Sequence, residues 1–182
     1  MQQYIASPRA RLRSDDVEIR VVGPEHAASA LMILREASRW LAGRGLRTWS
    51  EGDLRRTDLP GQSARGCLIL GFSSTGPAAC MLLQCSDSHY WPRARQGSAL
   101  YLHKLAVRRA YEGCGWGVRM VAWAKAETQR RGIRRLRLDT LADSPLAGFY
   151  AAQGVHFISR AKHPEDDRAM WRLECRLSCA GT

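Results

Sequence analysis

Three glycines stand at every second position where a strand-like segment meets a helix-like segment: Gly113, Gly115 and Gly117. Glycine has no Cβ, so the backbone can come close to a ligand there, and the first N–H groups and the dipole of the following helix attract an anion. Because Val118 breaks the G-x-G-x-x-G spacing and no Gly-Lys-Ser/Thr follows, neither the dinucleotide fingerprint nor the P-loop fits. The pattern indicates either a phosphate-binding loop or a glycine turn that packs a helix on a strand.

A histidine lies within the strand-like segment that leads into these glycines. His103 stands two residues before Leu105, so regular strand alternation predicts that both side chains point to one face. An imidazole changes its charge near neutral pH and is suited to proton transfer. His103 is therefore our first candidate for a general base, with a hydrogen-bonded core histidine as the alternative. His89 and Asp139 are weaker candidates for the base.

The elements that must position these residues follow one another as in a single domain. Apolar runs predict strands at residues 17–22, 67–72, 78–85, 99–107, 134–141, 155–159 and 170–177. Helical periodicity and end signals predict helices over 24–43, from 50, over 114–131 and over 143–153. The polar loop at 87–98 and the connector at 161–168 are candidates for substrate contacts.

The composition fits one domain with a basic surface. With 182 residues, of which 45% are apolar, the chain can bury one sizeable core. We expect residues 1–16 to form a flexible basic arm and residues 17–182 to form the domain. The 28 Lys+Arg against 17 Asp+Glu give a net charge of +11. This charge suits nucleic acid, an acidic partner or a polyanionic cofactor, and coding bias explains it equally well.

The cysteines and the apolar runs indicate the cellular compartment. The six cysteines include no C-x-x-C pair, and no histidine stands at zinc-ligand spacing, so we expect reduced thiols and no metal site. Cys114 precedes a helix that would lower its pKa, but no His–Asx pattern accompanies it, so we do not expect a nucleophilic cysteine. Neither a signal peptide nor a run of about 18 apolar residues is present, which predicts a cytoplasmic protein without a membrane segment.

Two well-separated motifs resemble the GCN5-related N-acetyltransferase (GNAT) family. The first is Leu-His-Lys-Leu-Ala-Val at 102–107 followed by Glu-Gly-Cys-Gly-Trp-Gly at 112–117. The second is Phe-Tyr-Ala-Ala-Gln-Gly-Val at 149–155, after a strand that ends in Leu-Asp. The resemblance covers residues 17–177. It implies an α/β (α+β) fold with a mixed, mostly antiparallel twisted sheet of about seven strands flanked by about four helices.

The resemblance also implies acetyl-CoA as the cofactor, with the strand along the pantetheine arm and the glycine loop at the phosphates. The residues that it places at the cofactor are Leu105, Ala106, Val107, Glu112, Gly113, Cys114, Gly115, Trp116, Gly117, Val118 and Asp143. Glu112 replaces the Gln or Arg usual in the family and brings a carboxylate near phosphates, with neighbouring arginines to offset it. Asp143 stands where the family often has Asn.

The mechanism implied by the resemblance is direct attack of a neutral amine on the thioester through a tetrahedral intermediate. Tyr150 aligns with the family's tyrosine and would protonate the leaving thiolate. A backbone N–H near Val107 would stabilise the oxyanion, and His103 would act as the base. The residues expected around the acceptor are Trp40, Trp49, His89, Tyr90, Trp91 and Asp139, together with the connector at 161–168.

The acceptor expected from this lining is a small primary amine or an amino-acid-like metabolite rather than a polycation such as an aminoglycoside. The alternative acceptor within the family is a protein N-terminus or lysine, which would need an open groove. The alternative to an acetyltransferase is a protein without catalytic activity, either an acyl-CoA sensor or a nucleic-acid-binding module. Against nucleic-acid binding, the arginines are scattered and no known nucleic-acid-binding motif is present. The sequence leaves the acceptor, the acyl-chain preference and a homodimer open.

Overall fold

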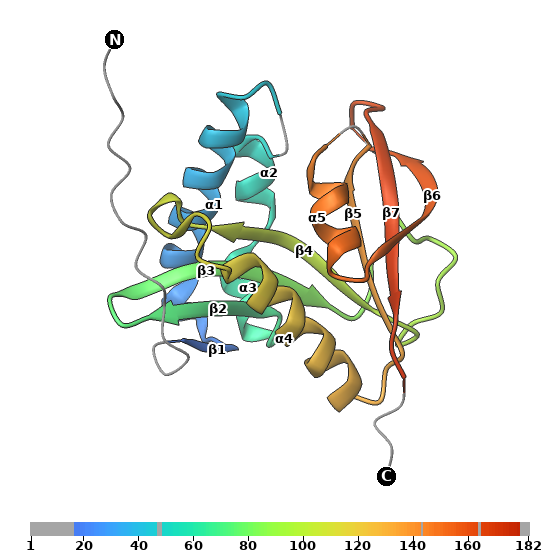
Figure 1. Ribbon diagram of the computed structural model, residues 1–182, viewed down its shortest axis with the longest axis horizontal. Coiled ribbons are helices and arrows are strands. Elements are labelled where there is room, and N and C mark those ends of the chain that lie inside the picture. Colours follow the sequence, from blue (N-terminus) through green and yellow to red (C-terminus); the bar gives the residue numbers. More distant parts are fainter. Residues whose placement is uncertain (1–16, 47–48, 143, 164, 179–182) are drawn as a thin grey trace.

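The computed structural model describes residues 17–46, 49–142, 144–163 and 165–178 (Figure 1). These residues form a seven-stranded sheet in the order β1-β2-β3-β4-β5-β7-β6, in which only β4 and β5 run parallel. All the predicted strands are confirmed, whereas the predicted arm at 1–16 and Asp143 lie outside the described residues. The strands are β1 Glu18–Val21, β2 Leu68–Ser73, β3 Gly76–Gln84, β4 Leu100–Val107, β5 Arg135–Leu141, β6 His156–Lys162 and β7 Ala169–Arg176.

Five α-helices accompany the sheet in the described part of the chain. They are α1 Ala27–Ala42, α2 Glu51–Arg56, α3 Leu59–Ala64, α4 Trp116–Arg130 and α5 Leu146–Ala152. Of these, only α3 was not predicted, because its segment Leu-Pro-Gly-Gln-Ser-Ala has no helical apolar pattern. The helix begins instead at an N-cap, where the Asp58 carboxylate accepts a hydrogen bond from the Gly61 N–H at 3.1 Å.

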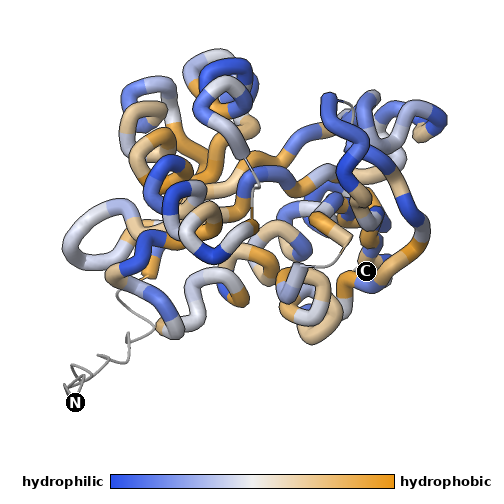
Figure 2. The backbone as a smooth tube through the Cα atoms, turned by 90° about the horizontal axis from the view of Figure 1, so that it is seen from above, coloured by the Kyte–Doolittle hydropathy of each residue, from blue (hydrophilic) through white to orange (hydrophobic). Residues whose placement is uncertain are grey.

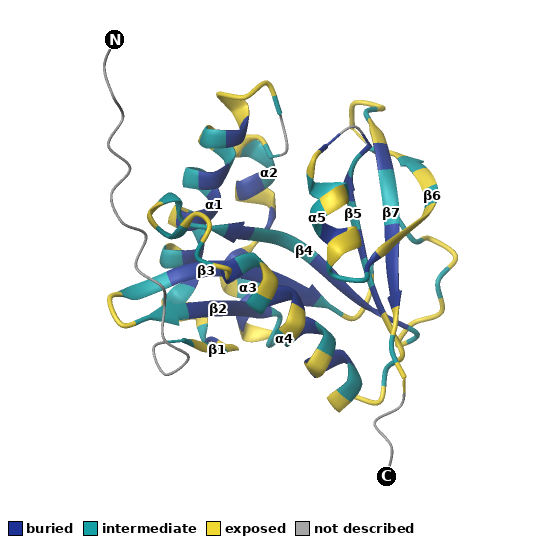
Figure 3. Ribbon diagram, viewed as in Figure 1, coloured by how far each residue is buried: buried dark blue, intermediate teal, exposed yellow. Residues whose placement is uncertain are grey.

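The sheet separates two apolar cores. Trp116 and Met120 of α4 pack against one face, and Ile33 and Leu34 of α1 pack against the other. Figure 3 shows that β2 and β3 are largely buried between these helices and that β4 is buried where it begins, whereas β6 is an exposed edge strand. The hydropathy colouring in Figure 2 places apolar segments mostly inside the fold and hydrophilic segments mostly around it. Within the described residues, no helix has the length and apolar character needed to cross a membrane.

A bulge interrupts β4 near its middle. From His103 to Ala106, β4 advances three residues while the paired strand β3 advances two, and Lys104 takes a left-handed φ of 51°. Leu102 and Leu105 consequently both pack in the core beneath α4. The expectation that His103 and Leu105 share a face is therefore wrong. The alternation changes phase at Lys104, so His103 points to the opposite face from Leu105.

β4 and β5 stay together only where both strands begin. Leu100 pairs with Leu136 and Tyr101 pairs with Arg137, and beyond these pairs the two strands diverge (Figure 1). The later part of β4 thus has a strand neighbour on its β3 side, while its other edge faces the opening between the strands. Backbone groups on that edge are left for a ligand to satisfy.

The buried face of β2 lies unusually close to the start of α4. A Cβ at Gly71 would lie 2.5 Å from a ring carbon of Trp116 and 3.2 Å from Met120 Sδ. We expect Gly71→Ala to lower the free energy of unfolding by about 1–3 kcal/mol, because overpacking forces the indole to move. Denaturant unfolding measures this loss. The control is Gly148→Ala in α5, where a Cβ meets open space and stability should be unchanged or higher. Equal stability of the two variants would contradict the packing argument.

Candidate active site

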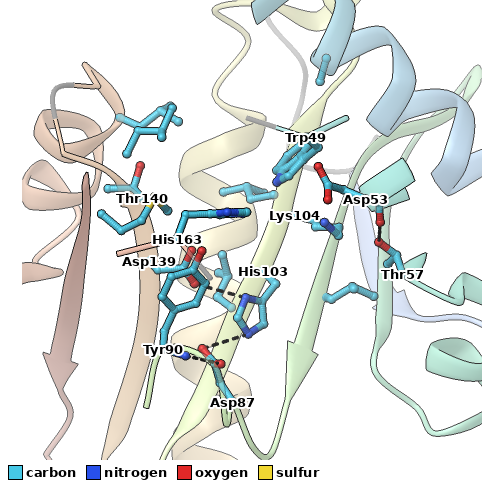
Figure 4. Close-up of a pocket in the computed structure, with 18 of the residues that line it drawn as sticks. Trp49, Asp53, Thr57, Asp87, Tyr90, His103, Lys104, Asp139, Thr140 and His163 are labelled. Carbon is cyan, nitrogen blue, oxygen red and sulfur yellow. Dashed lines mark hydrogen bonds and ion pairs between the residues drawn. The ribbon is translucent and has the colours of Figure 1, made fainter. Parts of the chain in front are cut away.

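The divergence of β4 and β5 opens a cavity of about 700 Å³, a volume typical of small-molecule sites. Residues of α1 and α2 form one wall, and residues of β5 and α5 form the other, with β4 between them. The segment after β3 and the turn between β6 and β7 complete the lining (Figure 4). Because β6 continues to Lys162, the first two residues of the predicted connector at 161–168 belong to the strand, and the described residues that remain form the β6–β7 turn.

A histidine flanked by two carboxylates lies in this cavity. His103 Nδ1 is 3.5 Å from Asp139 Oδ1, and His103 Nε2 is 3.8 Å from Asp87 Oδ2 (Figure 4). The Asp87 side chain is only 4% exposed. Its Oδ1 accepts hydrogen bonds from the backbone N–H groups of His89 and Tyr90 at 3.1 and 3.0 Å. The loop after β3 thereby holds this carboxylate against the imidazole.

These charges control the protonation of His103. Burial disfavours the imidazolium, but the carboxylates of Asp139 and Asp87 outweigh burial and raise the pKa of His103 above its ordinary value. The ligand atoms of the three side chains lie within 4.8 Å of one another. However, the two ring nitrogens face different carboxylates, which suits the two N–H donors of an imidazolium, whereas one metal ion would contact only one ring nitrogen. The arrangement therefore suits proton transfer better than metal binding.

Tyr150 lies across the cavity from β4, on α5. The side chain is 7% exposed, lines the cavity and packs edge-to-face on Phe149 with a ring separation of 5.1 Å. Burial, together with the negative charge of Asp139, raises the pKa of the Tyr150 phenol. The phenol therefore stays protonated at neutral pH and can donate a proton or a hydrogen bond into the cavity.

The glycine loop leads directly into the N-terminus of α4. Gly113 and Gly115 have left-handed φ values of 73° and 81°, a conformation that other residues rarely adopt. Gly115 is the N-cap and provides no side-chain cap, and the Arg119 N–H donates to its carbonyl at 3.1 Å. The backbone N–H groups of residues 116 to 118 lie ahead of this first hydrogen bond of the helix, so they have no acceptor within the helix. They provide the unpaired donors that a pyrophosphate needs.

Glu112, the unusual residue in this loop, is held by an arginine. Its carboxylate pairs with the Arg109 guanidinium, which also stacks on the Trp40 ring at 3.8 Å from the centroid. The Arg109 backbone N–H in turn donates to Glu36 at 2.6 Å. The negative charge that the sequence places beside the predicted phosphate site is thus offset within the loop.

The structure brings most of the predicted site residues to the cavity and leaves some elsewhere. The predicted residues that line it are Trp40, Trp49, His89, Tyr90, His103, Leu105, Ala106, Val107, Gly117, Asp139 and Tyr150. Trp91 is outside this lining, with its ring against the Arg137 guanidinium at 4.3 Å. Trp116 is buried in the core, so only its backbone is available to a ligand.

Several residues of the cavity have no clear signal in the sequence. In the sequence, Asp87 is only the first residue of the polar loop. An Asp whose carboxylate accepts hydrogen bonds from the N–H groups two and three residues later is nevertheless a recognisable turn signal. Lys104 was included only as part of a motif. The pair Arg56 and Glu165 joins α2 to the β6–β7 turn through N–O distances of 2.8 and 2.9 Å. A contact between residues so far apart in sequence has no local signal.

Comparison with known proteins agrees with this geometry. The model of the acetyltransferase (GNAT) family matches residues 47–155. The N-acetyltransferase YesJ of Bacillus subtilis is 33% identical over 143 residues, which cover 74% of this chain and 78% of YesJ. A GNAT-family acetyltransferase structure from Listeria monocytogenes superposes with a TM-score of 0.73 at 19% identity, covering 88% of this chain and 95% of that one. The PaiA N-acetyltransferase of Thermoplasma acidophilum, in complex with coenzyme A, gives a TM-score of 0.67 at 16% identity, covering 88% and 98%.

Proposed function

The chain belongs to the GNAT family of acetyltransferases, which use acetyl-CoA, and from this premise we propose that its acceptor is the primary amine of a small molecule. The observation that carries the proposal is the bridge from Arg56 to Glu165, which spans the cavity between α2 and the β6–β7 turn. A cavity that an ion pair crosses suits a small molecule, whereas a protein N-terminus or lysine needs an open groove.

We assign the cofactor to the edge of β4 that faces β5 and to the start of α4. Leu105, Ala106 and Val107 would line the pantetheine arm, and the backbone from Gly113 to Val118 would bind the phosphates. A Cβ at Gly117, in the first turn of α4, would lie 3.1 Å from the Phe149 ring, so a side chain there would press on this cavity residue. Bound acetyl-CoA supplies the activated thioester.

The chain's own residues would handle the protons. In this proposal, the neutral His103 ring is oriented by Asp139 at Nδ1 and accepts the proton of the amine at Nε2, and the Asp139 and Asp87 carboxylates then stabilise the charge of the imidazolium. Tyr150 donates a proton to the departing sulfur. A backbone N–H near Val107 supports the oxygen on which negative charge develops. The Arg108 N–H already donates to the Ala78 carbonyl at 2.8 Å, so it is not available to the oxyanion. The N–H that stabilises the oxyanion would therefore belong to a residue before Arg108.

The test is an assay of acetyl-CoA consumption over a panel of amines, combined with a calorimetric titration of CoA. We expect CoA to bind and at least one small primary amine to be acetylated. The panel includes peptides with free N-termini and a lysine peptide. Faster acetylation of a peptide than of every small amine would contradict the proposed acceptor class, and the absence of CoA binding would contradict the cofactor site.

We also expect Gly115→Ala to raise the Kd for CoA by about tenfold. A side chain in the left-handed conformation costs roughly 1–2 kcal/mol, and relief of that strain would move the N–H groups that face the phosphates. Gly132→Ala is the matched control, because Gly132 has a φ of 70° and open space around its Cβ position but follows the far end of α4. Both variants should lose stability, and only Gly115→Ala should lose affinity. Equal Kd values would argue against the loop as the phosphate site.

A further inference from the structure

Lys104 directs its ammonium group into the cavity from the bulge in β4. Its left-handed φ of 51° breaks the strand alternation, and its side chain is among those that line the cavity. The ammonium nitrogen lies 5.2 Å from the centroid of the Trp49 ring. Figure 4 shows Lys104 on the side of Trp49 and Asp53, whereas His103 points towards Asp87 and Asp139.

The other charged groups around the cavity form ion pairs with one another. Arg56 pairs with Asp53 at 2.7 Å as well as with Glu165. The two aspartates beside His103 form ion pairs with its ring. Arg168, at the β6–β7 turn, pairs with Asp166 at 2.6 Å.

Lys104 differs from these groups. No ion pair or hydrogen bond joins its ammonium group to any side chain in the described part of the protein. Burial lowers the pKa of this lysine, and the charges of Asp53 and Asp139 only partly oppose the effect. Burial of a cation that has the Trp49 ring beside it but no ion pair costs free energy, and an anionic group on a ligand would lower that cost.

We propose that Lys104 binds a carboxylate of the acceptor, so that the substrate is an amine that also carries a carboxylate, as an amino acid does. The inference rests on the proposed acetyl transfer to a small amine. His103 and Lys104 line the same cavity, and the Asp139 carboxylate beside His103 also acts on the charge of Lys104, so the amine at the imidazole and the carboxylate at the ammonium can belong to one small molecule. The Trp49 ring offers an apolar surface to its carbon chain.

A carboxylate fits this position better than a phosphate. Phosphate groups are commonly held by several donors or by the planar fork of arginine. The cavity arginine nearest to Asp53, Arg56, is already paired with two carboxylates. A single ammonium group matches a single negative charge.

The experiment compares kcat/KM for matched amines with and without a carboxylate. The pairs are leucine with isoamylamine and phenylalanine with phenethylamine, and phosphoethanolamine represents the phosphate. For the unaltered chain we expect the carboxylated member to be preferred by about ten- to a hundredfold, the size of a charge-assisted hydrogen bond. Lys104→Met should bring the ratio close to one, and Lys104→Arg should retain part of it. Lys162→Met, which removes an exposed charge on β6, should leave the ratio unchanged.

Each outcome decides between distinct conclusions. Equal kcat/KM values for both members of each pair, or a preference that survives in Lys104→Met, would overturn the inference, while acetylation of the amines would still support the proposed function. Preference for phosphoethanolamine would overturn the carboxylate assignment. Acetylation of Lys104 itself, detected by intact-mass measurement, would also overturn it. The CoA titration on Lys104→Met verifies the fold, because an unchanged Kd shows that the cofactor site is intact.

Discussion

Replacing Tyr150 with Phe is expected to lower kcat by a factor of about 10²–10⁴, the usual contribution of a positioned general acid. The phenol is buried, and burial with the charge of Asp139 raises its pKa, so it enters the reaction protonated. Without the hydroxyl, the thiolate must leave without a proton from the protein. The measurement is steady-state turnover of the best amine in the panel.

The structure offers controls for this prediction. The ring of Tyr150 packs on Phe149, and the Phe variant keeps that contact, so the Kd for CoA and the stability should change little. Tyr101→Phe removes a hydroxyl that contacts Arg137 at 3.4 Å outside the cavity lining, and its turnover should be close to that of the unaltered chain. A Tyr150→Phe rate within twofold of normal would exclude the acid role and leave the fold assignment intact.

Replacing His103 with Ala is expected to lower kcat/KM by about 10²–10³ at neutral pH, because the amine loses its proton acceptor. The pH dependence gives the sharper test. The base works only when it is neutral, and the carboxylates raise the pKa of His103, so kcat/KM should fall as the pH drops below a value higher than the ordinary pKa of about 6.5.

The Asp139→Asn variant tests whether the Asp139 carboxylate controls the protonation of His103 or only supports the structure of the site. Removal of this carboxylate takes away a charge that favours the imidazolium, so the acidic limb of the kcat/KM profile should move to lower pH. Asp58→Asn, at the N-cap of α3, removes a carboxylate outside the cavity lining while keeping a good cap, and its limb should not move. An unchanged limb in Asp139→Asn would show that another group controls the protonation step.

The sequence predicted the fold well because strand and helix patterns and the two GNAT motifs are local signals. For the same reason it singled out His103 and Tyr150, which line the cavity, and the glycine loop, which precedes α4; their roles stay predictions. It misjudged the direction of His103, since a bulge depends on how β4 pairs with β3 and alternation alone cannot reveal it. It did not predict that Asp87 and Lys104 reach the cavity, because the loop after β3 places Asp87 and the bulge in β4 places Lys104.

The placement of Trp91 illustrates the same limit. A tryptophan in a polar loop beside His89 and Tyr90 suggests a pocket wall, and the two neighbours do line the cavity. The indole instead packs against the guanidinium of Arg137 on β5. Consecutive residues in an irregular loop point in unrelated directions, so sequence proximity does not predict which of them reaches a site.

The bridge between Arg56 and Glu165 has a consequence for how a substrate enters. Its two side chains are 59% and 55% exposed, and an exposed ion pair contributes at most about 1 kcal/mol, less than twice the thermal energy. Exposed side chains rearrange within picoseconds to nanoseconds, whereas a catalytic cycle lasts roughly milliseconds to a second. A small molecule can therefore pass during one brief opening and react after the bridge has re-formed, while a polypeptide would have to hold the bridge apart for the whole cycle.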